Sequence, residues 1–235
     1  ILFNKSFKMI SQINFNQITP EIVLRFLSKL QEVNFLGDVH KDYATRIVTA
    51  TDNSIYQVVP QAVVFPKNFN DIEKVLKIAN EKQFRKTIKI SPRGGGTGTN
   101  GQSLTKGVVL DFSRYMINIL ETNFDEGWVR VEPGVVLDQL NEYLASRKMF
   151  IAPDLSPSNR ATLGGMINTD ACGKGSRIYG RTSDHILELN CVLSNGVSLH
   201  SRPLDSKNLN KYKNKNGVTG KIFRIVEKVV SENKK

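Results

Sequence analysis

A chain of 235 residues can bury a substantial core as one large domain or two small ones. Its two cysteines cannot build a disulfide framework and no Cys/His cluster indicates a metal site, so we predict a reducing, cytoplasmic setting. The formal net charge of +11 suggests nucleic-acid binding, but residues 202–235 hold ten Lys/Arg against three Asp/Glu, or +7, and lack the interleaved aromatic residues of a base-stacking surface. We therefore interpret that segment as a solvated, partly disordered tail and predict no specific nucleic-acid binding.

Membrane and export signals are weak. No apolar run approaches the roughly 18–20 residues that span a bilayer. The N-terminal sequence ILFNKSFKMIS lacks an apolar signal region and a small-residue cleavage site. We expect no membrane span.

The first part of the chain alternates predicted helices and strands. Thr19 as N-cap and Pro20 at the first helical position predict a helix with an apolar face through Leu30. Residues 38–57 are polar and turn-rich. The next predicted elements are a strand at 62–65, a helix from a capping box at Asn70–Glu73 to about Gln83, and a strand at 87–90.

A glycine-rich loop follows, in SPRGGGTGTNGQS at residues 91–103. It satisfies the dinucleotide pattern G-x-G-x-x-G, and it satisfies the P-loop pattern except that Gln102 replaces the lysine. Both motifs need a helix directly after the glycines, whereas Val108–Phe112 is typical of a strand. We therefore reject both motifs and predict a nest of backbone N–H groups that binds an anion.

The second part of the chain contains another concentration of glycine. Residues 152–185 show little regular pattern, and a structureless stretch of this length is usually functional. Gly164-Gly165 is expected to begin a short helix. The other predicted elements are strands at 107–112, 117–122 and 128–132, a helix at 136–147, strands at 187–193 and 197–199 joined by an Asn-Gly turn, and a helix at about 220–233.

Five segments in this order resemble the FAD-linked oxidases of the vanillyl-alcohol-oxidase/PCMH type. They are PQAVVFP (60–66), PRGGGTGTNGQ (92–102), EGWVRVEPGV (126–135), SNRATLGGMINTDACGKGS (158–176) and YGRTSDH (179–185). Within that family the chain is most similar to the flavin domain of the large bacterial D-2-hydroxyglutarate dehydrogenase-like proteins that also carry an iron–sulfur module. The resemblance covers roughly residues 15–200.

The resemblance implies an α+β fold, a PCMH-type FAD-binding domain of two α/β subdomains with FAD between them. It implies that Gly94, Gly95, Gly96, Thr97, Gly98, Asn100 and Gly101 hold the FAD diphosphate. Pro153, Thr162, Gly164, Gly165, Thr169, Asp170, Gly173, Tyr179 and Gly180 would line the isoalloxazine and ribityl chain, and Val192 would meet the adenine end. Relatives with covalent flavin place a histidine where this chain has Thr97, so we expect non-covalent FAD.

Several of these residues have a second interpretation. Arg93 could pair with a phosphate or form a salt bridge that supports the loop. Asp170 could bond the flavin or cap a turn. Cys172 resembles a redox thiol but more simply fills a tight bend, and His185 could be a general base or make a structural hydrogen bond.

The boundaries that follow are an N-terminal helical extension at 1–58, a first FAD subdomain at 59–103, a second at 104–201, and a basic tail with a terminal helix at 202–235. The reaction implied by the resemblance is oxidation of a 2-hydroxy acid, with hydride passing from substrate Cα to flavin N5. The family's substrate domain, catalytic histidine and cluster cysteines do not appear after residue 201, so we expect a truncated flavin domain that needs a partner chain or further sequence. The alternative is a vestigial or binding-only fragment. The catalytic residues are unknown, and no metal ligand is predicted.

Overall fold

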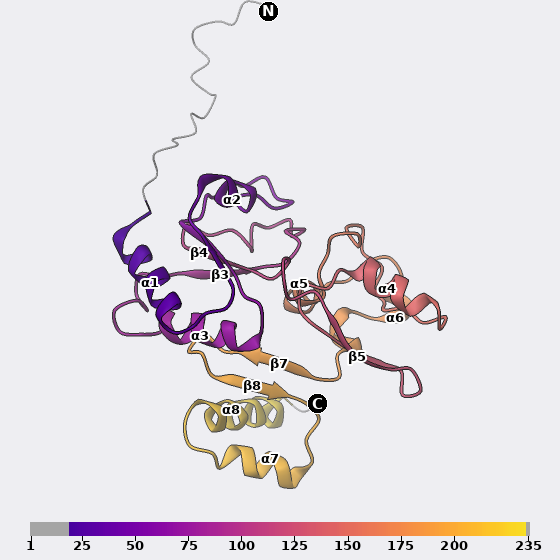
Figure 1. Cartoon of the computed structure of the whole chain (residues 1–235). Helices are drawn as coiled ribbons and strands as arrows, with labels where there is room; N and C mark the ends of the chain where they lie inside the picture. Colours follow the sequence, from indigo (N-terminus) through magenta and orange to yellow (C-terminus); the bar gives the residue numbers. More distant parts are fainter. Residues whose placement is uncertain (1–18, 234–235) are drawn as a thin grey trace, which may run out of the picture.

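The computed structural model of the chain describes residues 19–233, whose first half surrounds a four-stranded mixed sheet (Figure 1). Its strands lie in the order β1-β2-β4-β3, with β1 antiparallel to β2 and the other three parallel. They are β1 (Asp38–His40), β2 (Ala62–Phe65), β3 (Ile90–Arg93) and β4 (Val108–Asp111). The central strands β2 and β4 are buried at every residue, which matches their continuous apolar sequence.

Two helices cover one face of this sheet. In α1 (Glu21–Glu32) the buried residues Val23, Phe26, Leu27 and Leu30 recur at helical spacing. They form the main core with α3 (Phe69–Ala79) and with alternate residues of β2 and β4. The short helix α2 (Tyr43–Val48) follows β1.

The structure corrects the predicted starts of both long helices. Pro20, not Thr19, is the N-cap of α1, and its carbonyl accepts the N–H groups of the first turn. Asn68, not Asn70, caps α3 by accepting the N–H of Asp71. The buried Asp71 carboxylate does not cap the helix, because it accepts the backbone N–H groups of Leu36 and Lys67. The helix also ends at Ala79, earlier than predicted.

The strand predicted at 87–90 begins later and includes the residues before the glycines. Ile88 follows a turn, with its N–H donating to the carbonyl of Phe84, and β3 runs from Ile90 to Arg93. Pro92 fits there because β3 is an edge strand, where one side of the strand needs no ladder partner.

The second half contains two hairpins and a helical layer. The first hairpin pairs β5 (Ile119–Asn123) with β6 (Trp128–Val131), and the second pairs β7 (Leu189–Val192) with β8 (Ser198–Ser201). A second core lies among α4, α5 and the loops around them. The helices are α4 (Leu137–Ala145), α5 (Leu163–Thr169), α6 (Ser176–Tyr179) and the 3₁₀ turn η1 (Thr182–His185).

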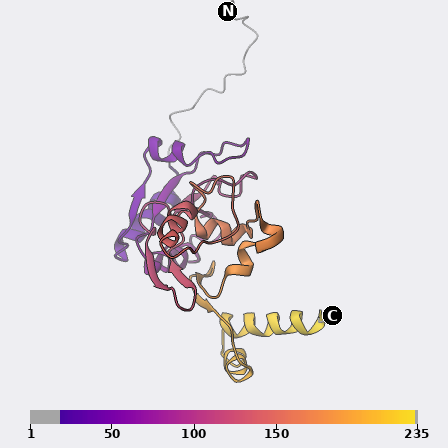
Figure 2. The ribbon, with the colours of Figure 1, turned by 90° about the vertical axis from the view of Figure 1, so that its right-hand side faces the viewer.

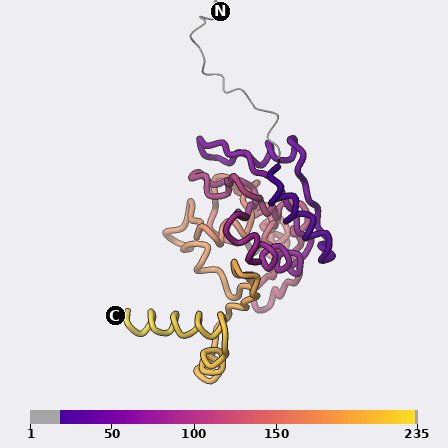
Figure 3. Tube along the Cα trace, turned by 90° about the vertical axis from the view of Figure 1, so that its left-hand side faces the viewer, coloured from indigo at the N-terminus to yellow at the C-terminus, as the bar shows by residue number. Residues whose placement is uncertain are grey.

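The expected disorder is wrong for residues 206–213, which form α7 (Ser206–Lys213), although none of these residues is buried. Asp205 caps this helix, and Tyr212 stacks on Phe223 of α8 (Val218–Glu232) with ring centroids 4.9 Å apart. Figures 2 and 3 show this helical pair extending away from the rest of the molecule. Aromatic packing explains why a segment rich in lysine and asparagine is helical.

The strand pairing bears on the proposed subdomain boundaries. β4 lies between β2 and β3, so the strand that follows residue 104 belongs to the same sheet as residues 59–103. A division after Phe112 therefore fits the hydrogen-bonded sheet better than one at residue 104. The predicted extension at 1–58 lies partly outside the described residues, and its described part contributes α1 and β1 to this unit.

Candidate FAD site

The glycine loop connects β3 to its parallel neighbour β4 without a helix. This agrees with the rejection of the dinucleotide and P-loop motifs, both of which require a helix to begin at the glycines. Two glycines of the loop, Gly96 and Gly101, have φ of 63° and 71°, which side chains rarely adopt. The loop therefore has a backbone shape that depends on glycine.

The structure brings the two glycine-rich segments together. A Cβ atom at Gly94 would clash with Oγ1 of Thr162, and one at Gly95 would clash with the carbonyl oxygen of Arg160. Nearly 70 residues of sequence separate the loop from this partner segment. The contact is possible only because neither glycine has a side chain, so the glycines here serve close packing between segments.

The surroundings of this contact fit a polar ligand. Thr162 is 3% exposed, and its Oγ1 has no hydrogen-bond partner among the described residues. Buried hydroxyls normally have a partner, so this atom marks a place for an acceptor or donor from outside the chain. Gly165, one helical turn along α5, is exposed, and a Cβ there would meet only Thr162 Oγ1, at 3.3 Å.

A cavity of about 280 Å³ adjoins the contact. Its lining joins Gly95 and Thr162 to residues from the turn after β4 and from the start of α4. The lining residues are Gly95, Ser113, Ile117, Gly134, Val136, Gln139, Asn159, Arg160 and Thr162. The glycine cradle, the unpartnered hydroxyl and the cavity together fit part of a dinucleotide cofactor such as FAD.

The outer loop residues are held from one side by the segment that follows α2. The carbonyl of Gly98 accepts the N–H of Asn53, and Tyr56 lies beside Gly101. The N–H of Asn100 donates to Oε1 of Gln102 at 3.1 Å. Thr97 is half-buried within the loop. Sequence reasoning did not place residues 49–56 at the site, because their only local signal was a polar, turn-rich composition.

Arg93 forms a salt bridge beside the glycine loop, which was the second of its two interpretations. Its side chain is 11% exposed and forms an ion pair with the buried Asp111, with 3.8 Å between Nε and Oδ2. Burial lowers the pKa of Arg93, opposed by the charges of Asp111 and Asp52, and burial raises the pKa of Asp111. A direct contact between Arg93 and a phosphate stays a prediction.

In the second glycine segment, Asp170 caps the end of α5 in the left-handed region, with φ of 46°. Its carboxylate accepts the N–H of Ser183 at 3.0 Å and lies 3.6 Å from Arg181. The hydrogen bonds from Ser183, followed by Arg181, hold the pKa of Asp170 below its usual value. Asp170 thus forms a turn that joins α5 to η1, and a bond to flavin stays a prediction.

The other residues of that segment surround a second cavity or support it. Thr169 Oγ1 bonds back to the carbonyl of Gly165, and Gly173 packs on the carbonyl of Asp154. Tyr179 meets Phe150 edge to face at 5.6 Å. The cavity of about 390 Å³ is lined by Leu137, Asp138, Asn141, Phe150, Ile151, Ala152, Asp154, Ser158, Lys174, Gly175 and Tyr179.

The remaining predicted residues line neither of the two cavities. Pro153 is buried directly after the lining residue Ala152, and Gly164 packs on Pro133. Gly180 ends α6 with φ of 81°. Val192 pairs with Ser198 in the β7–β8 hairpin and lines neither cavity.

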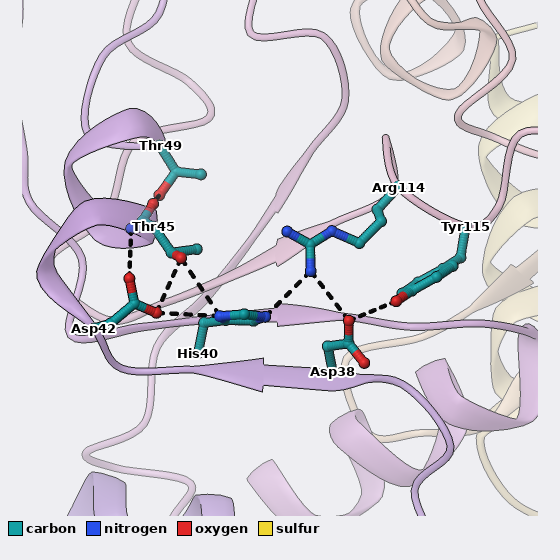
Figure 4. A network of polar contacts seen from close by, with 7 residues as sticks. All are labelled: Asp38, His40, Asp42, Thr45, Thr49, Arg114 and Tyr115. Carbon is teal, nitrogen blue, oxygen red and sulfur yellow. Dashed lines mark hydrogen bonds and ion pairs between the residues drawn. The ribbon is translucent and has the colours of Figure 1, made fainter.

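A polar network fixes the turn after β4 to the edge strand β1 (Figure 4). Asp38 accepts Tyr115 Oη at 2.5 Å and Arg114 Nη1 at 3.0 Å, and Arg114 also lies 3.1 Å from His40 Nε2. The hydrogen bond from Tyr115 is the largest cause that lowers the pKa of Asp38. Because a guanidinium only donates, Nε2 of His40 accepts this bond. The network thereby positions Ser113, which lines the first cavity.

None of the three histidines lines a described cavity. His185 Nε2 donates to the carbonyl of Tyr179 at 2.7 Å, the structural role that was one of its two interpretations. His200 lies 3.0 Å from Glu188. Within residues 19–233, no cluster of His, Cys, Asp or Glu could hold a metal ion, and no helix has the length and apolar character to cross a membrane.

Comparisons with known proteins show what the chain is similar to. The model of the FAD binding domain family matches residues 60–201. D-2-hydroxyglutarate dehydrogenase of Pseudomonas putida is 53% identical over 204 residues, which are 87% of this chain and 20% of that protein. The same enzyme of Escherichia coli is 48% identical over 218 residues, or 93% and 21%. The chain thus spans about a fifth of the length of these relatives.

Solved structures show the same fold at low sequence identity. An alkyldihydroxyacetonephosphate synthase matches with a TM-score of 0.67 and 22% identity, covering 82% of this chain and 41% of that one. p-Cresol methylhydroxylase with substrate bound matches with a TM-score of 0.63 and 19% identity, covering 78% and 36%. The predicted α+β fold of PCMH type is confirmed.

Proposed function

This chain belongs to the FAD-binding domain family, and from that membership we propose that it is the flavin-binding part of a dehydrogenase for D-2-hydroxy acids. FAD is its cofactor. The observation that most strongly supports the proposed site is the convergence of Gly94 and Gly95 on Arg160–Thr162, beside a buried hydroxyl without a partner. The substrate class is proposed from the relatives at about 50% identity.

In this proposal the glycine loop holds the diphosphate through the backbone N–H groups of Gly96, Thr97, Gly98 and Gly101. The N–H of Asn100 already donates to Gln102, so Asn100 would contribute its side-chain amide. Thr162 Oγ1 offers a hydrogen bond near the junction of the two segments, and the bare surface at Gly165 lets a flat ring approach α5. FAD, when bound, accepts the two electrons that leave the hydroxy acid. The protein supplies orientation and a partly desolvated setting for that transfer.

We propose that the cofactor is bound without a covalent bond. Thr97 stands at the position where covalently flavinylated relatives have histidine, and a hydroxyl cannot form a histidyl bond. Cys172 is exposed in the second segment and is the nearest alternative attachment point by sequence. Because an exposed thiol could form a covalent bond to the flavin, the test of non-covalent binding includes a variant that lacks Cys172. The free cysteines also support the proposed reducing, cytoplasmic setting.

The test begins with the purified chain and FAD. We expect saturable quenching of FAD fluorescence, and we expect acid precipitation to release all of the flavin into the supernatant. Flavin that stays with the pellet of the wild-type protein, but not with that of Cys172→Ser, would reveal a cysteinyl bond instead. Absence of any FAD binding would contradict the proposed site.

A second candidate function is FAD binding without catalysis by this chain alone. It is favoured by the positions of His40, His185 and His200, none of which lines a described cavity. Anaerobic addition of D-2-hydroxyglutarate distinguishes the two. Bleaching of the flavin absorbance by this chain alone would support a self-sufficient dehydrogenase, and bleaching only with the remaining domains of a relative would support a chain that needs completion.

A further inference from the structure

Arg93 lies at the junction of four segments that surround the glycine loop. Its Nη1 donates to the carbonyl of Thr49 and to Oγ of Ser103, each at 3.4 Å. Its Nε faces Asp111 at the end of β4. Oγ of Ser103 in turn donates to Asp52 at 3.5 Å. The guanidinium therefore joins the end of α2, both ends of the loop and β4.

The remaining nitrogen of Arg93 lies against the loop backbone. A Cβ atom at Gly96 would collide with Nη2 of Arg93, and Gly96 has φ of 63°. The backbone conformation favours glycine at residue 96, and the guanidinium occupies the space that a side chain there would take. Arg93 and Gly96 form one packing unit.

The Arg93–Asp111 ion pair has a fixed orientation relative to the glycine loop. Asp111 Oδ1 accepts the N–H and the hydroxyl of Ser113, at 2.8 Å and 2.6 Å, which fixes the carboxylate on the side of Arg93 away from the loop. The positive end of the Arg93–Asp111 pair faces the loop at Gly96. In a partly buried setting such a fixed dipole favours negative charge on the far side of the loop.

We propose that Arg93 is a positioning residue for the FAD diphosphate, acting through Gly96 from behind the loop and not by contact with a phosphate. The inference rests on the proposed FAD site. Asp52, Ser103 and Thr49 complete the unit by fixing the orientation of the guanidinium. This gives the segment after α2, which carries no glycine motif, a defined part in cofactor binding.

The test compares FAD affinity with the stability of the cofactor-free protein. Arg93→Lys keeps a cation for Asp111 but lacks the planar fork, so we expect the unfolding midpoint to stay close to wild type while the Kd for FAD rises three- to tenfold. Arg93→Met with Asp111→Asn removes both charges, which avoids leaving one buried charge unpaired. For this pair we expect at least a tenfold rise in Kd, and none for the matched exposed variant Arg85→Met.

Two further readouts separate positioning from direct contact. If Arg93 acts through Gly96, Arg93→Lys combined with Gly96→Ala costs no more affinity than the worse single change. If Arg93 contacted a phosphate, the Arg93→Met/Asp111→Asn protein would lose part of the salt dependence of the Kd, whereas we expect that dependence to be unchanged. Folded Arg93→Lys with wild-type affinity, additive effects, or a reduced salt dependence would each overturn the inference. Failure of the wild-type chain to bind FAD would instead reject the proposed function.

Discussion

Gly95 and Gly165 both belong to the predicted cofactor set, but a side chain would meet different surroundings at each. At Gly95 it would strike the carbonyl of Arg160, so this glycine is needed for the packing of the two segments. At Gly165, on the exposed side of α5, its only close neighbour would be Thr162 Oγ1, 3.3 Å from the added Cβ atom. A substitution at Gly165 can therefore block a ligand without disturbing the packing of the fold, whereas a substitution at Gly95 would disturb both.

We therefore expect Gly165→Ala to weaken FAD binding at least tenfold without destabilising the cofactor-free protein. Alanine is about 1 kcal/mol more favourable than glycine within a helix, so the unfolding midpoint should stay the same or rise. Gly95→Ala should lower that midpoint. Thermal unfolding and fluorescence titration measure both quantities, and wild-type affinity in Gly165→Ala would argue against a ring lying on α5.

Thr162 allows a second test at the scale of one atom. Thr162→Val keeps the shape and removes the hydroxyl that has no partner in the described structure. We expect unchanged stability without FAD and a three- to tenfold weaker Kd, because one hydrogen bond contributes about 0.5–1.5 kcal/mol. Thr182→Val is the matched control, since Thr182 Oγ1 donates to the carbonyl of Ala171 at 2.7 Å. That variant should lose stability with or without cofactor.

At the scale of the element, helix ends depend on partners that lie elsewhere in the chain. Asp42 caps α2 by accepting the N–H of Thr45 at 2.9 Å (Figure 4). This hydrogen bond is the first of several causes that lower the pKa of Asp42 from 3.8 to about 2. Because α2 leads to the carbonyl of Thr49, which accepts Arg93, its end also bears on the glycine loop.

The low pKa of Asp42 gives a pH prediction. Since the pKa in the folded state lies below the unfolded value, the carboxylate stabilises the protein above about pH 4, and this contribution is lost as the pH falls toward 2. We expect Asp42→Ala to cost about 1 kcal/mol at pH 7 and clearly less at pH 2.5. Urea unfolding at both pH values measures the difference. A penalty that is equal at both values would contradict the capping role.

At the scale of the whole molecule, residues 19–233 form the flavin-binding body and a projecting helical pair (Figure 2). The family match ends at residue 201, and α7 and α8 pack chiefly on each other through Tyr212 and Phe223. Ile225, Val226, Val229 and Val230 of α8 are each about half exposed. The pair therefore contributes little to the site.

We expect removal of residues 203–235 to leave the Kd for FAD within twofold of the intact chain. The physical reason is that the glycine loop, Thr162 and both cavities are built from residues before 203. Fluorescence titration of both proteins at equal ionic strength checks this. A loss of binding with retained secondary structure would show that the helical pair supports the site.

The sequence by itself determined most elements, because β-branched runs and turn residues act locally, and its resemblance to the FAD-linked oxidases pointed to the family and the cofactor. Ala62–Phe65, the Asn-Gly turn before β8 and the short helix at Gly164-Gly165 could all be predicted in this way. Only the tertiary structure decided that Asn68 caps α3, that Arg93 faces Asp111, and that residues 49–56 border the loop. Each of these outcomes involves a hydrogen-bond or packing partner that lies far away in the sequence, such as Leu36, whose N–H donates to Asp71 of α3. A local sequence pattern carries no information about such a partner.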